Sequence, residues 1–129
     1  AMAVAAAHAV LDVMVDEKLC DRSAALGKQL TQRLRELQAR CPALAEVRGP
    51  GSMVAVEFLD PTTRQPDAAT TKAVQHAAMQ RGLLLLTCGQ HGNVIRFLYP
   101  LTIPQAQFDA ALAIIDESIM QAHTLRTAA

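Results

Sequence analysis

The sequence predicts an α+β domain in which helices cover one small, largely antiparallel sheet of about three to four strands. Two helical patterns open the chain, two pairs of short apolar runs follow with a third helical pattern between them, and a fourth helical pattern closes it. Short glycine-containing turns join the runs of each pair, which favours antiparallel hairpins. No repeat or linker of domain length divides the 129 residues, so residues 1–129 are expected to form a single domain.

The first two helices are expected over residues 3–15 and from Asp16 to about Arg40. Residues 3–15 are alanine-rich and apolar on nearly every side, so this helix needs contacts on more than one face. The rest of a chain of this size can cover one face, and we expect a segment outside the chain to cover another. Asp16 suits the N-cap of the second helix. The buried stripe of the second helix is expected to be Leu26, Leu30, Leu34 and Leu37.

Residues typical of helix ends indicate the boundaries of the third and fourth helices. Asp67 suits the N-cap of the third helix, and Gly82 suits the C′ position that ends it. The fourth helix is expected to begin near Pro104, because proline is favoured at the first helical position. The residues after His123 are expected to be frayed. The buried stripe of the fourth helix is expected to be Phe108, Leu112, Ile115 and Ile119.

Four strands are expected over residues 45–48, 53–59, 83–87 and 93–100. The run 83–87 is continuously apolar and therefore predicts a buried strand. The loop 88–93 contains two glycines and is expected to join the last two strands as a hairpin. Period-two alternation places three apolar residues of the second strand on one face, namely Val54, Val56 and Phe58.

Arg96 is the residue most informative about function, because it carries a charge in the middle of an apolar strand. Burying a guanidinium is costly unless an anion meets it. Two explanations stay open from the residues alone. Arg96 is either structural, paired with Glu57 or Glu46 or placed on an exposed edge, or it grips the carboxylate of a ligand with its planar, permanently charged fork.

The loop before Arg96 supports the second explanation. Glycines let a backbone come close to a ligand, and polar side chains in a loop supply contacts to it. Gly89, Gly92 and Asn93 are therefore a candidate active-site loop.

Other kinds of site are weakly indicated. Cys88 and His91 have CxxH spacing, but no second pair of metal ligands lies near them and no third group orients a Cys–His pair, so no metal is expected. The turn 49–52 lacks the Lys-Ser/Thr ending of a phosphate loop and leads into a strand. The 12 basic and 12 acidic residues balance, which predicts neither nucleic acid nor a membrane surface as a partner.

The three cysteines are widely spaced and form no CxxC pattern. This usage predicts reduced thiols and a cytoplasmic location. The N-terminus lacks the basic region and cleavage site of a signal peptide, and its apolar run 2–15 is too short to span a bilayer.

Several segments carry a family resemblance. Residues 47–58 read Val-Arg-Gly-Pro-Gly-Ser-Met-Val-Ala-Val-Glu-Phe and resemble the VRGxGxM…E(F/L) hairpin of the C-terminal small domain in class III, pyridoxal-phosphate-dependent aminotransferases. Residues 3–11 are similar to the helix that follows the glycine-asparagine-proline segment of that family. Residues 82–89 and 93–103 are most similar to the bacterial 4-aminobutyrate aminotransferases within the class. The resemblance runs in order over about residues 3–122.

The resemblance implies the small C-terminal domain of a fold-type I transferase. In that family the arginine matching Arg96 binds the α-carboxylate of glutamate or 2-oxoglutarate, and it pairs with a glutamate of the large domain when the amine donor has no α-carboxylate. The Schiff-base lysine, the aspartate at the pyridine nitrogen and the phosphate-binding loops belong to the large domain. The resemblance therefore implies a fragment whose large domain lies upstream of residue 1, with no catalytic or cofactor-binding residue of its own and no bound pyridoxal phosphate.

The resulting hypothesis is that the intact enzyme transfers an ω-amino group to 2-oxoglutarate through pyridoxal phosphate, while this chain recognises the substrate carboxylate and is inactive alone. The expected partners are the large domain of the same enzyme and further copies in a homodimer or higher oligomer. Two alternatives stay open: a self-standing module that binds a small carboxylate, and a purely structural association domain. The residues do not identify the amine donor.

Overall fold

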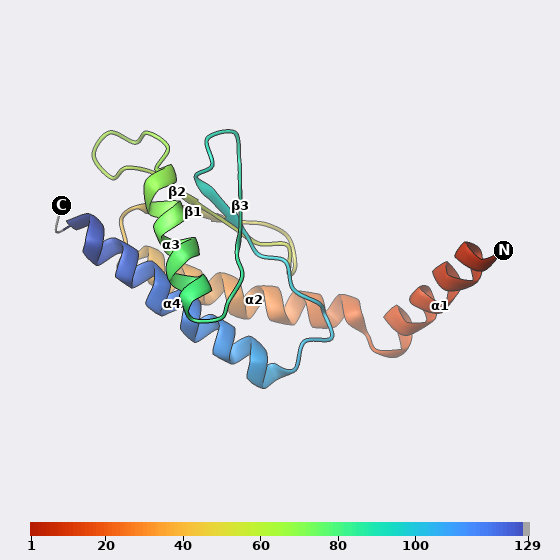
Figure 1. Cartoon of the computed structure of the whole chain (residues 1–129). Coiled ribbons are helices and arrows are strands. Elements are labelled where there is room, and N and C mark those ends of the chain that lie inside the picture. Colours follow the sequence, from red (N-terminus) through yellow and green to blue (C-terminus); the bar gives the residue numbers. More distant parts are fainter. Residues whose placement is uncertain (128–129) are drawn as a thin grey trace.

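A computed structural model describes residues 1–127, which form four helices and one four-stranded sheet (Figure 1). The predicted α+β class is confirmed. In chain order the elements are α1 Met2–Asp16, α2 Leu19–Gln38, β1 Leu44–Arg48, β2 Ala55–Phe58, α3 Ala68–Gln80, β3 Leu86–Cys88, β4 Val94–Arg96 and α4 Gln105–Thr127.

The sheet has the strand order β1-β2-β4-β3, and every neighbouring pair is antiparallel. The chain passes from β2 through α3 to the outer strand β3 and returns along β4, so β4 lies between β2 and β3. The predicted hairpin between the last two strands is confirmed. One row of neighbouring residues crosses the sheet: Arg48, Ala55, Arg96 and Leu86.

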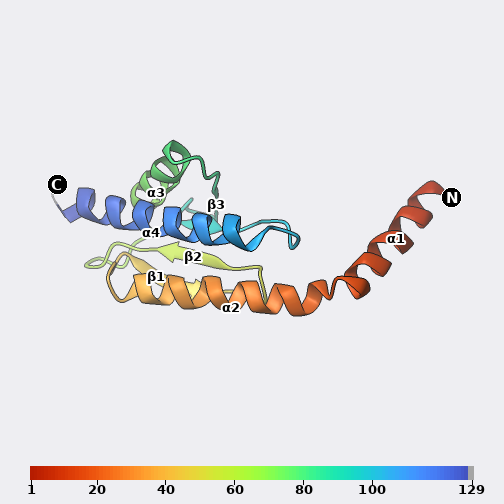
Figure 2. The ribbon, with the colours of Figure 1, turned by 90° about the horizontal axis from the view of Figure 1, so that it is seen from below.

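Apolar side chains from one face of the sheet join those of α2, α3 and α4 in a single core. Val54, Val56 and Phe58 are all fully buried, as their alternation predicted. The leucine stripe of α2 is buried in the same core, and α2 and α4 run side by side along it (Figure 2). In the stripe of α4, Phe108, Ile115 and Ile119 are buried and Leu112 is half-buried.

The start of α2 differs from the prediction. Asp16 is the last residue of α1, and α2 begins at Leu19 without a side-chain cap. The chain turns between the two helices at Lys18, whose φ of 49° lies in the left-handed region. Closing the last turn of α1 fixes this geometry, since the Lys18 N–H bonds the carbonyl of Val15.

The run 83–87 was wrongly predicted as a buried strand. Only its last residues enter β3, and the side chains of Leu84 and Leu86 are 83% and 52% exposed. This exposure arises because β3 is an edge strand of the sheet. Only Leu85 of this run is buried in the core. The strand around Arg96 is also shorter than predicted, since β4 ends at Arg96 itself.

The end of the chain is more ordered than predicted. Helix α4 begins directly after Pro104 and continues to Thr127, so the predicted fraying after His123 is wrong within the described residues. Arg126 explains the difference, because its guanidinium forms ion pairs with both Asp60 and Asp67. Residues 128–129 lie outside the described part of the chain.

Helix α1 projects away from the rest of the molecule (Figures 1 and 2). None of its residues is buried, so the expectation that the chain itself covers one face of this helix is wrong. Its exposed apolar residues include Met2, Val4, Val10, Leu11, Val13, Met14 and Val15. No helix within residues 1–127 has the length and apolar character needed to cross a membrane.

Candidate functional site

Arg96 ends β4 on the face of the sheet opposite the core. Its neighbours across the sheet are Ala55 of β2 and Leu86 of β3. The side chain is exposed, although the strand that carries it lies inside the sheet and not at its edge. Arg96 forms no ion pair or side-chain hydrogen bond with any residue in 1–127. The guanidinium is therefore open to a ligand or to another polypeptide.

The two acids that sequence reasoning offered to Arg96 are both bound to a different arginine. Nη1 of Arg48 lies 2.7 Å from Oε2 of Glu57 and 2.7 Å from Oε2 of Glu46. Glu46 and Glu57 are direct cross-strand neighbours, and the single cation between them offsets the repulsion of two like charges. The structural pairing proposed for Arg96 with Glu57 or Glu46 is therefore not the one that forms.

Glu57 is held at both of its oxygens. Oε2 meets Arg48, and Oε1 accepts a hydrogen bond of 3.1 Å from Nδ2 of Asn93. These contacts, that of Arg48 above all, lower the pKa of Glu57. The hydrogen bond to Glu57 in turn raises the pKa of Arg48. The Arg48–Glu57 pair is thus charged at neutral pH and keeps a defined geometry beside Arg96.

A buried side chain anchors the predicted active-site loop to the sheet. Asn93 is buried, and its side-chain N–H group also donates to the carbonyl of Phe58 at 3.0 Å, so this residue fastens the loop to β2. Gly89 and Gly92 have φ values of +85° and +66°, in the region that glycine adopts most easily. The loop therefore positions the start of β4, and Asn93 points inward and not toward solvent.

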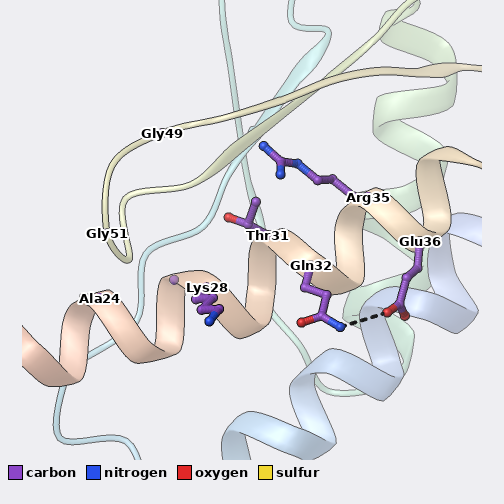
Figure 3. Close-up of a pocket in the computed structure, with 9 residues that line it drawn as sticks. Ala24, Lys28, Thr31, Gln32, Arg35, Glu36, Gly49 and Gly51 are labelled. Carbon is purple, nitrogen blue, oxygen red and sulfur yellow. Dashed lines mark hydrogen bonds between the residues drawn. The ribbon is translucent and has the colours of Figure 1, made fainter.

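An apolar cavity of about 90 Å³ opens beside Arg96. Its walls come from the segment 83–86, the chain that follows β4, and α4, and Arg96 supplies the charged group at its edge. A larger open hollow of about 700 Å³ lies elsewhere, between α2 and the turn that joins β1 to β2 (Figure 3). Lys28, Thr31 and Arg35 line that hollow, but it contains none of the predicted site residues.

The lysines of the chain do not fit the reacting amine of a pyridoxal-phosphate enzyme. Such a lysine works where burial or a neighbouring cation makes its amine nucleophilic. Lys18, Lys28 and Lys72 are all exposed. The described residues also gather no group of three His, Cys, Asp or Glu side chains suited to a metal ion, and Cys88 and His91 belong to no such cluster.

Sequence reasoning missed one contact that supports the segment after Arg96. Nε and Nη2 of Arg22, near the start of α2, donate to the carbonyls of Leu101 and Ile103. These partners are 79 and 81 residues apart in sequence. Most helical arginines lie on the outer side of their helix, so no local sequence pattern predicts that Arg22 makes this contact.

Comparison with known proteins places the chain in a family. The profile of the class-III aminotransferases matches residues 1–119. A 5-aminovalerate aminotransferase of Pseudomonas putida is 50% identical over 116 residues, which are 90% of this chain and 27% of that protein. The 4-aminobutyrate aminotransferase of Escherichia coli is 38% identical over 122 residues, which are 94% of this chain and 29% of that protein.

Solved structures agree with this result. A phospholyase from Arthrobacter, in complex with phosphoethanolamine, matches with a TM-score of 0.80 and 29% identity over 87% of this chain and 27% of that one. The lysine aminotransferase of M. tuberculosis matches with a TM-score of 0.73 and 32% identity over 88% of this chain and 24% of that one. The chain belongs to the class-III aminotransferase family, as its motifs indicated. It spans about 27% of the length of its Pseudomonas putida relative.

Proposed function

We propose that the chain is the small-domain part of a 4-aminobutyrate-type aminotransferase and that Arg96 binds the α-carboxylate of glutamate or 2-oxoglutarate. The observation that carries the proposal is an exposed guanidinium on the open face of the sheet, while both neighbouring acids are bound to Arg48. The names of the relatives support an ω-amino acid as the amine donor, because 4-aminobutyrate and 5-aminovalerate both carry a terminal amine.

The chain's own contribution is to bind and orient. A guanidinium meets a carboxylate through two parallel hydrogen bonds, which fix the direction of the substrate as well as its distance. The pyridoxal phosphate of the intact enzyme supplies the amine-transfer chemistry. The residues that hold this cofactor belong to the large domain, so no catalytic or cofactor-binding residue is assigned within residues 1–129.

The proposed partners are the large domain of the same enzyme and further copies in a homodimer or higher oligomer. Helix α1 supports this part of the proposal. It carries seven exposed large apolar residues, from Met2 to Val15, and none of its residues is buried against the described chain. Apolar surface of this extent on one helix is typical of a protein contact.

The test is steady-state kinetics of Arg96→Ala in the complete enzyme that carries these residues. Loss of a charged, bidentate contact is worth about 1.5–3 kcal/mol, so KM for 2-oxoglutarate should rise about 10- to 150-fold. Arg96→Lys keeps the charge without the fork and should recover part of the loss. An unchanged KM in Arg96→Ala would refute the assignment.

Calorimetry on the isolated chain separates the proposal from a self-standing binding module. The proposal expects no glutamate binding at submillimolar concentration and no turnover of 2-oxoglutarate with added pyridoxal phosphate. Submillimolar binding that Arg96→Ala abolishes would favour the module.

A further inference from the structure

Glu57 occupies the same diagonal position relative to two arginines. Its direct neighbours are Glu46 on β1 and Val94 on β4. Arg48 and Arg96 each lie two residues along those strands, in the cross-strand row that contains Ala55. Diagonal neighbours on one face of a sheet are about 7–8 Å apart, within reach of a long charged side chain. Glu57 is therefore placed to pair with either arginine.

In the structure Glu57 pairs with Arg48 only. The contact to Nη1 of Arg48 is 2.7 Å, and Asn93 occupies the second carboxylate oxygen. One carboxylate oxygen of Glu57 thus faces Arg48 on β1 and the other is held by Asn93, so Arg96 engages neither of them. Ala55, which stands between the two arginines, carries no charge that interferes with either.

We infer that Arg48 is a positioning residue, which keeps Arg96 free for a substrate carboxylate by holding Glu57 away from it. This inference rests on the proposed role of Arg96 and adds a determinant of its affinity. A ligand must displace any anion that Arg96 already binds. A neighbouring glutamate would compete for the fork in every molecule, because it is tethered on the next strand and cannot diffuse away.

The expected result follows from the strength of an exposed ion pair. Replacing Arg48 by Gln in the complete enzyme frees Oε2 of Glu57 to pair with Arg96, while Asn93 still holds Oε1. Exposed pairs of this kind are weak, so KM for 2-oxoglutarate should rise about 2- to 5-fold with little change in kcat. Adding Glu57→Gln to Arg48→Gln removes the competing anion and should return KM to within about 2-fold of the starting enzyme.

A matched control separates this effect from a general loss of stability. Arg48→Gln also leaves Glu46 and Glu57 facing each other as unscreened like charges. The double variants Arg48→Gln/Glu46→Gln and Arg48→Gln/Glu57→Gln both remove that repulsion. Only the first of them keeps Glu57 as an anion that can pair with Arg96. We expect KM to recover with Glu57→Gln and to stay raised with Glu46→Gln.

Two outcomes overturn the inference: equal recovery in both double variants, or no change of KM in Arg48→Gln. Arg96→Ala, measured beside them, shows which idea has failed. A large effect of Arg96→Ala with no effect of Arg48→Gln removes the positioning role alone. No effect of Arg96→Ala removes the proposed function as well.

Discussion

Gly27 of α2 lies directly against the backbone of Gly51, in the turn between β1 and β2. A Cβ atom on Gly27 would lie 1.7 Å from the carbonyl oxygen of Gly51, which is far inside contact distance. The two serines beside this contact, Ser23 and Ser52, join their hydroxyl groups at 2.7 Å. The turn can therefore pack directly on α2 because Gly27 has no side chain. This contact sets how β1 and β2 approach α2.

We expect Gly27→Ala to destabilise the domain, although alanine is the better helix former. The gain in helix propensity is about 1 kcal/mol, whereas forcing a methyl group into a packed contact costs about 1–3 kcal/mol or more. Urea unfolding should show a lower midpoint. Gly82→Ala is a comparison for backbone strain without a clash, because its new Cβ meets nothing within 4 Å and it should lose stability only through its φ of +85°. A Gly27→Ala variant as stable as the parent would mean that the turn moves freely away from α2.

Two leucines test the core and its boundary. Leu34 on α2 is 0% exposed, and Leu84 before β3 is 83% exposed. Leu34→Ala should lower the free energy of unfolding by about 2–5 kcal/mol through lost burial and the cavity left behind. Leu84→Ala should change it by less than about 0.5 kcal/mol. Similar losses in both variants would show that the side chain of Leu84 is buried after all.

These two leucines also show what the sequence predicts and what it leaves out. The stripe containing Leu34 follows helical spacing, so its buried face is a local property of the chain. The run containing Leu84 is equally apolar, but exposure depends on whether its strand lies inside the sheet or at the edge. Strand order is decided by pairing between distant segments, and no local pattern encodes it. The fold class and the helical stripes were therefore predictable, while the place of the edge strand was not.

The same distinction holds for the site. The sequence indicates Arg96 as a candidate because a charge inside an apolar run is unusual in itself. Its surroundings were not predictable, because the choice of Glu57 between Arg48 and Arg96 depends on the register of three strands. The sequence favours Asn93 as a loop residue facing a ligand, but its amide is buried against β2. A residue type that suits a binding loop equally suits the internal hydrogen bonds of a turn.

Asp67 links the start of α3 to the end of α4 and makes stability depend on pH. Burial acts to raise the pKa of Asp67, but the N–H and hydroxyl of Thr70 and the Arg126 guanidinium together hold it below its ordinary value. A carboxyl group with a lowered pKa stabilises the fold above its unfolded pKa of about 4, and this contribution is lost as pH falls through the folded pKa.

Asp67→Ala removes the cap and the ion pair with Arg126, and it should cost at least about 1 kcal/mol at pH 7. Asp67→Asn retains an oxygen for the Thr70 N–H but loses the charge and the Oδ2 acceptor of the Thr70 hydroxyl and Arg126. It should cost less than Asp67→Ala. The expected difference between the parent and Asp67→Asn begins to shrink below the unfolded pKa of about 4 and is lost as pH falls through the lower folded pKa, because the parent carboxyl then becomes uncharged. Urea unfolding at a series of pH values checks this, and a difference that does not vary with pH would exclude the charge of Asp67 as its cause.

Because α1 exposes many apolar side chains, we expect the isolated chain to associate with itself. The side chains of Val4, Leu11 and Val15 are 60%, 58% and 75% exposed, and association would remove them from water. Sedimentation at rising protein concentration should show a growing fraction of dimer or larger species. Val4→Glu/Leu11→Glu should shift the chain toward monomer, since charges on that surface oppose its burial. Leu125→Glu is the matched control, because Leu125 is 61% exposed on α4, away from α1, and should leave association unchanged. A monomer at every concentration would show that the apolar surface of α1 is too small to drive self-association.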